Sequence, residues 1–185
     1  MKEIRIHARA GQGAITTANL LGYTYFLKGM YAYAFPHFGA ARMGAPMNAF
    51  VRADNKPVCL RSQIYEPDYV VVVDATLMRA SNCFQGLKPK GIAIVNERPG
   101  LEIPKVKVTQ KLFVIPANDI AMKTIGRPLG NTALLGAYAA ATGEVELQHL
   151  IEAIKKIFAA KAKAREGNVE AVKQGFAFAK DKSKG

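Results

Sequence analysis

The chain has 185 residues, half of them apolar, and 26 Lys and Arg residues against 14 Asp and Glu residues give a formal net charge of +12. This apolar content excludes an intrinsically disordered protein. Two cysteines, Cys59 and Cys83, are too few for a disulfide scaffold, and the longest apolar run, residues 133–141, is far shorter than the roughly 20 residues of a membrane span. The N-terminus lacks the apolar stretch of a signal peptide. We therefore expect one domain, residues 1–185, that is cytoplasmic and does not contact membranes.

The positive charge is concentrated at the C-terminal end, where residues 155–185 carry a net charge of +6. The basic residues of this segment are Lys155, Lys156, Lys161, Lys163, Arg165, Lys173, Lys180, Lys182 and Lys184. Such a segment can bind nucleic acid, form a solvated helix face, or meet an acidic partner subunit. No helix-turn-helix, zinc or RNA-binding signature accompanies the charge, which argues against nucleic acid.

The first half of the chain predicts a strand, a glycine turn and a helix, followed by a second strand, a loop and a hairpin. Alternating or β-branched residues predict the strands, and turn residues such as Asp54–Pro57 separate them. The elements in order are a strand at Ile4–His7, a turn at Arg9–Gly13, a helix at Ala14–Leu27, a strand at Tyr31–Phe35, a loop at Pro36–Pro46, a strand at Met47–Ala53, and a hairpin return at Val58–Leu60.

The second half predicts strands buried on both faces, typical of a parallel sheet, and several helices. The strands are Tyr69–Asp74, Gly91–Asn96 and Leu112–Ile115, and the helices are Leu77–Leu87, Ala117–Ile125, Thr132–Ala141, an amphipathic helix over Leu147–Phe158, and a last helix capped by Asn168 with Val169, Val172 and Phe176 as its apolar stripe. This order predicts a three-layer, Rossmann-like α/β domain with a mostly parallel sheet, a β-hairpin and a basic helical C-terminal arm.

The glycine turn is the first candidate functional feature. Gly11 and Gly13 would let an anion approach the unpaired N–H groups at a helix N-terminus. A dinucleotide site would have glycine or alanine in place of Thr16 and an acid about twenty residues later, but no Asp or Glu occurs between Glu3 and Asp54. The turn therefore indicates either an anion site that does not take NAD or a glycine needed only for the tight turn.

Catalytic constellations are mostly missing from the sequence. The two cysteines form no C-x-x-C pair, and the three histidines have no metal spacing. No Gly-Asp dipeptide, the usual start of a thiamine diphosphate magnesium site, is present. Asp74 ends a buried strand at the edge where open α/β sheets bind ligands; it either serves such a site or caps the helix before Thr76. We predict no catalytic and no metal-binding residue in this chain.

Several stretches, in order along almost the whole chain, resemble one family. They are Arg9–Ala14, Ala34–Gly39, Arg42–Pro46, Leu60–Asp68 and Gly130–Ala137, followed by Lys161, Asn168, Ala171 and Gly175. Together they resemble the gamma subunit of the 2-oxoacid:ferredoxin oxidoreductases, pyruvate synthase in particular. The departures are Ala10 for the first glycine of the usual Gly-Gly-Gln-Gly, His37 for an aromatic residue, and Met43 for an arginine.

The resemblance implies a subunit of a complex that converts pyruvate, coenzyme A and oxidised ferredoxin to acetyl-CoA, CO2 and reduced ferredoxin, or the reverse. Thiamine diphosphate, magnesium and the iron–sulfur clusters would be held by companion alpha, beta and delta subunits. The gamma chain would contribute to coenzyme A binding and to assembly. By this resemblance the coenzyme A residues would be Gly11, Gln12, Gly13, Thr16, Arg42 and Asn131. Two alternatives are a subunit for another 2-oxoacid, such as 2-oxoisovalerate or 2-oxoglutarate, and a stand-alone nucleotide-binding module.

Overall fold

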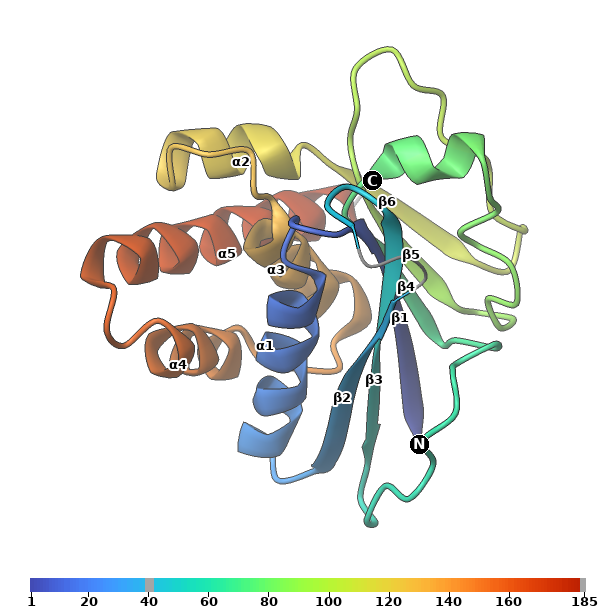
Figure 1. Cartoon of the computed structure of the whole chain (residues 1–185), viewed down its shortest axis with the longest axis horizontal. Coiled ribbons are helices and arrows are strands. Elements are labelled where there is room, and N and C mark those ends of the chain that lie inside the picture. The colour runs from blue at the N-terminus through green and yellow to red at the C-terminus, as the bar shows by residue number, and fades with distance from the viewer. Residues whose placement is uncertain (39–41, 184–185) are drawn as a thin grey trace.

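A computed structural model describes residues 1–38 and 42–183 and shows a six-stranded mixed sheet with helices packed on one face (Figure 1). Gly39 and Lys184, named above, lie outside the described residues. The strands are β1 (Lys2–Arg9), β2 (Tyr31–Phe38), β3 (Pro46–Asp54), β4 (Tyr69–Val72), β5 (Ile92–Asn96) and β6 (Lys111–Ile115). Their order in the sheet is β2-β3-β1-β4-β5-β6.

The sheet is parallel from β1 through β4 and β5 to β6, with Ile6, Val71, Ile94 and Phe113 in register across these four strands. β3 is antiparallel to both of its neighbours, β1 and β2. The carboxyl ends of β1, β4, β5 and β6 therefore meet at one edge of the sheet, where the candidate site lies.

The predicted hairpin, in which Val58–Leu60 returns along Met47–Ala53, was wrong, and the antiparallel partner of β3 on its outer side is β2 instead. Both edges of β3 are already occupied by β1 and β2, so no edge remains for that segment. Its neighbourhood instead supplies backbone acceptors to a buried arginine: the Arg52 guanidinium donates to the carbonyl oxygens of Ser62 at 2.6 Å and Gln63 at 3.3 Å.

Five helices cover one face of the sheet, namely α1 (Ala14–Leu27), α2 (Ala117–Thr124), α3 (Asn131–Thr142), α4 (Leu147–Ile157) and α5 (Ala162–Lys182). Figure 1 shows α1 and α3 next to the sheet, with α4 and α5 packed outside them. Leu20, Leu134 and Leu150 are fully buried in the main core between these layers. None of the helices formed by the described residues is long and apolar enough to cross a bilayer.

The opposite face is covered by one short 3-10 helix, η1 (Ala75–Arg79), and by irregular segments. The predicted helix over Leu77–Leu87 was wrong beyond this turn. A helix there would use its carbonyl groups internally, whereas the carbonyl oxygens of Cys83 and Gln85 accept hydrogen bonds from the buried Arg5 guanidinium. Gly86 also has a φ of +76°, outside the helical region. The predicted α/β class with a mostly parallel sheet is confirmed, with a third layer that is largely irregular.

The C-terminal segment is helical and basic, as predicted, but it is part of the helical layer and not a separable arm. α5 begins at Ala162, so Asn168 lies inside the helix and does not cap it. The Asn168 side chain is buried, donates to the Ala164 carbonyl at 2.7 Å and accepts from the Thr132 hydroxyl of α3 at 2.9 Å. The buried position of Asn168 inside α5 is explained by its contact with α3, which the local sequence does not reveal.

Candidate functional site

The glycine turn between β1 and α1 has the backbone that its sequence predicts. Gly11 and Gly13 have φ angles of +95° and +80°, a region that side-chain-bearing residues rarely adopt. A Cβ atom at Gly13 would lie 2.9 Å from the side-chain nitrogen Nδ2 of Asn131, the first residue of α3. The turn therefore requires glycine for its conformation, and the Asn131 side chain lies directly against it.

This turn opens onto a cavity of about 1030 Å³ between α1, the α2–α3 connection and the start of α5. Five of the six predicted site residues line it: Gly11, Gln12, Gly13, Thr16 and Asn131. The sixth, Arg42, does not. The structure thus brings together residues that are more than a hundred positions apart in the sequence.

The charges around this cavity all have one sign. Its lining, as far as the structure describes the chain, contains four basic side chains and no carboxylate. The four are Lys123, Arg127, Lys161 and Lys163, and all are exposed. Cationic side chains beside two helix N-termini, those of α1 and α3, create a positive potential that favours an anionic ligand.

Sequence reasoning missed how these cations are grouped. Lys163 was recognised only as part of the basic C-terminal segment, Lys161 as part of that segment and of the family resemblance, and Lys123 and Arg127 were not singled out. One local signal was available: Arg127 lies four residues before α3, and Lys161 directly precedes α5. Basic residues beside helix N-termini do not complement the helix dipole, so their charge adds to the positive potential of these helix ends.

Arg42 lies in a short loop that is attached to the glycine turn. The Ala10 N–H donates to the Ala45 carbonyl at 2.9 Å, and the Gly44 N–H donates to the Ala10 carbonyl at 3.0 Å. Arg42 itself is exposed. It therefore borders the turn without lining the cavity.

Asp74, which follows β4, contacts the turn from inside the protein. Its Oδ2 accepts from the Gln12 amide at 2.8 Å and from Nε of Arg9 at 3.2 Å, and its Oδ1 accepts from the Thr76 N–H at 2.9 Å. Burial would raise the pKa of this carboxyl, but the hydrogen bonds from Thr76 and Gln12 hold it below its ordinary value. Asp74 therefore both caps η1 and anchors the turn.

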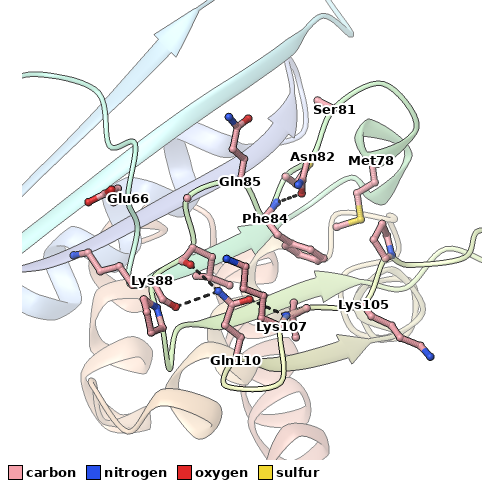
Figure 2. Close-up of a pocket in the computed structure, with 16 residues that line it drawn as sticks. Glu66, Met78, Ser81, Asn82, Phe84, Gln85, Lys88, Lys105, Lys107 and Gln110 are labelled. Atoms are coloured by element: carbon pink, nitrogen blue, oxygen red, sulfur yellow. Dashed lines mark hydrogen bonds between the residues drawn. The ribbon is translucent and has the colours of Figure 1, made fainter.

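A second cavity, of about 750 Å³, lies on the irregular face and is shown in Figure 2. Apolar side chains such as Phe84 and Met78 line it together with Lys88, Lys105 and Gln110. Lys88 is already engaged with Asp68 at 3.1 Å and Glu3 at 3.4 Å. None of the predicted site residues contributes to this cavity.

The cysteines and His7 lie outside the predicted site. Among residues 1–38 and 42–183, no three His, Cys, Asp or Glu side chains come close enough to hold a metal ion. Cys59 is exposed and Cys83 is buried, and both are free thiols. Burial, with the nearby Arg5 charge, lowers the pKa of His7 to about 3, which keeps its ring neutral.

Comparison with known proteins identifies the family to which this fold and site belong. Residues 3–178 match the profile of the pyruvate ferredoxin/flavodoxin oxidoreductase family. The chain belongs to this family. It is 46% identical to the pyruvate/ketoisovalerate oxidoreductases common subunit gamma of Pyrococcus furiosus, over 95% of this chain and 96% of that one. It is also 46% identical to the pyruvate synthase subunit PorC of Methanosarcina barkeri, over 84% and 85% of the two chains.

Solved structures of the family have the same fold. The pyruvate oxidoreductase subunit PORC of Thermotoga maritima superposes with a TM-score of 0.79 at 35% identity, covering 96% of each chain. The 2-oxoglutarate:ferredoxin oxidoreductase of Magnetococcus marinus contains the same fold, with a TM-score of 0.81 at 19% identity, in 31% of its chain. The expected membership of a 2-oxoacid oxidoreductase family, as a gamma-type subunit that works with other subunits, is confirmed.

Proposed function

We propose that this chain is the gamma subunit of a pyruvate:ferredoxin oxidoreductase and that the cavity beside its glycine turn binds the phosphate-bearing end of coenzyme A. The names of its relatives support the first part. The observation that carries the second part is the joining of the Gly11–Gly13 turn to four cations, without a carboxylate, in one cavity. Coenzyme A carries several phosphate charges on its nucleotide end, and this arrangement complements them.

Two groups of residues would bind the phosphate charge of coenzyme A from two sides of the cavity. The backbone N–H groups of the turn at the N-terminus of α1 and the Asn131 amide would contact one phosphate, since helix N-termini favour anions. The hydroxyl of Thr16 lies on the first turn of α1, beside them. Lys123, Arg127, Lys161 and Lys163 would neutralise the remaining phosphate charge from the other side of the cavity.

The rest of the reaction would take place on companion subunits. Alpha, beta and delta subunits would hold thiamine diphosphate, magnesium and the iron–sulfur clusters, and ferredoxin would accept the electrons of the complex. In this division the chain binds and orients the acyl acceptor. We further propose a cytoplasmic location for the complex.

A second candidate differs in the substrate. The Pyrococcus furiosus relative is named as a subunit common to pyruvate and ketoisovalerate oxidoreductases. A chain whose site takes only coenzyme A can serve several 2-oxoacids, because the oxoacid would bind elsewhere. Co-purification with two different sets of companion subunits would support this broader role, and one set alone would support a dedicated pyruvate enzyme.

The proposal is tested by removing two cavity cations in the assembled complex. Lys161→Ala with Lys163→Ala should raise the coenzyme A KM at least tenfold, since a single charged hydrogen bond contributes roughly 1.5–3 kcal/mol and about 1.4 kcal/mol corresponds to a factor of ten. The pyruvate KM and the kcat should stay near wild type, because binding lost equally from ground and transition states does not lower kcat.

The matched control is Lys173→Ala with Lys180→Ala, which removes the same charge from exposed positions of the same helix, outside the cavity lining. This control should leave the coenzyme A KM unchanged. Equal effects of the two pairs would mean that only overall charge matters, and no effect of either would refute the coenzyme A site.

A further inference from the structure

The Asp74 carboxylate joins two segments of the chain, the glycine turn and the start of η1. Its Oδ2 accepts from Gln12 and Arg9, which belong to the turn, at 2.8 and 3.2 Å. Its Oδ1 accepts from the N–H and the hydroxyl of Thr76 at 2.9 and 2.6 Å. Both carboxylate oxygens are thus used within the protein.

Gln12 carries this anchoring into the backbone of the turn. Its side-chain oxygen accepts from the Arg9 N–H at 2.8 Å, and its own N–H donates to the Arg9 carbonyl at 3.0 Å. The Gln12 side chain therefore bridges the end of β1 and the carboxylate that follows β4. Its amide groups serve the conformation of the turn, which distinguishes it from Gly11 and Gly13 on either side.

Arg9 is engaged in the same way and does not add its charge to the cavity. Besides Asp74, its guanidinium contacts the Thr76 hydroxyl at 3.1 Å and the Gly44 carbonyl at 3.1 Å. The pairing offsets the arginine charge and also holds the loop that carries Arg42 against the turn. Consistent with this, Arg9 is not among the residues that line the cavity.

We infer that Asp74 is a positioning residue for ligand binding: through Gln12 and Arg9 it fixes the glycine turn in the conformation that presents its N–H groups to a ligand phosphate. The inference rests on the proposed function and assigns Asp74, which does not line the cavity, a role behind the binding surface, with Gln12 of the lining as its link to the turn. Holding the turn rigid before binding avoids the free-energy cost of ordering it when the ligand arrives.

The same strand provides a comparison for Asp74 at its other end. Asp68, just before β4, accepts from the Glu3 N–H at 2.8 Å and from Lys88 at 3.1 Å. It resembles Asp74 in charge, in its cationic partner and in its tie to β1. It lies at the amino end of β4, however, whereas the glycine turn lies at the carboxyl ends of the parallel strands.

The experiment compares Asp74→Asn, Gln12→Ala, their combination, and Asp68→Asn in the assembled complex. Asp74→Asn and Gln12→Ala should each raise the coenzyme A KM at least fivefold, with kcat at saturating coenzyme A and the pyruvate KM unchanged. The double variant should be no worse than the more severe single variant, because both changes break the same connection. Asp68→Asn should leave the coenzyme A KM at the wild-type value.

The outcomes separate this inference from the proposed function. An unchanged coenzyme A KM in Asp74→Asn, while Lys161→Ala with Lys163→Ala raises it, would refute the positioning role and leave the coenzyme A site intact. An equal rise in Asp68→Asn would also overturn it, because a general loss of stability would then suffice. If Asp74→Asn does not assemble, Gln12→Ala decides alone: a wild-type coenzyme A KM in that variant refutes the inference.

Discussion

Replacing Gly175 by alanine should destabilise the protein, although alanine normally stabilises a helix. Gly175 lies inside α5, and a Cβ atom there would overlap the backbone of Ala133 in α3. The reciprocal contact exists at Gly136 of α3, where a Cβ atom would overlap the backbone of Val172 in α5. The overlapping atoms are backbone, so the clash can be relieved only by separating the two helices.

The expected size follows from two opposing effects. Alanine gains about 1 kcal/mol over glycine in helix propensity, while overpacking of a tight contact costs up to about 3 kcal/mol. The net loss of about 2 kcal/mol corresponds to a decrease in Tm of about 4–8 °C for a protein of this size. Both values can be measured by urea and thermal unfolding.

The matched control is Ala177→Gly, on the exposed side of the same helix. It should cost about 1 kcal/mol through helix propensity alone. A Gly175→Ala variant that is as stable as wild type, or more stable, would refute the close packing of α3 on α5.

Two further predictions concern buried polar groups. The hydroxyl oxygens of the fully buried Tyr25 and Tyr138 are 2.6 Å apart. Replacing one tyrosine by Phe should lower the free energy of unfolding in urea by about 1–3 kcal/mol, whereas replacing both should be close to neutral. Additive losses in the double variant would contradict the pairing of the two hydroxyls. The His7 ring takes up a proton below about pH 6.5 in the unfolded chain, but only near pH 3 in the folded chain. The free energy of unfolding should therefore fall by up to about 1.4 kcal/mol per pH unit as the pH is lowered from about 6.5 to about 3. The variant His7→Gln should lose this contribution, and an unchanged slope would show that His7 is not held neutral.

The sequence predicted those elements that local signals determine. The helix Ala14–Leu27 was predicted at its observed bounds, because a glycine turn precedes it and Gly29 follows it. The buried strands β4 and β5 were found from short uninterrupted apolar runs rich in valine and isoleucine. The glycine turn and Asn131, which the family resemblance grouped together, line the same cavity.

The failures all involve contacts between distant residues. Val58–Leu60 could not pair because β1 takes the free edge of β3, and residues 77–87 could not form a regular helix because Arg5 requires their carbonyl groups. Asn168 resembles a helix cap until its bond to Thr132, 36 residues earlier, is known. The four cations of the cavity come from the end of α2, from the α2–α3 connection and from the start of α5, and only the packing of these helices brings them together.

The most direct test of the central claim is photoaffinity labelling of the assembled complex with a coenzyme A analogue that carries an azide on its adenine. The proposed site predicts that this chain is labelled, in peptides that contain residues 122–131 or 161–168, and that excess coenzyme A prevents the labelling. Labelling confined to the companion subunits, or labelling of this chain that excess coenzyme A does not reduce, would contradict the assignment of the cavity to coenzyme A.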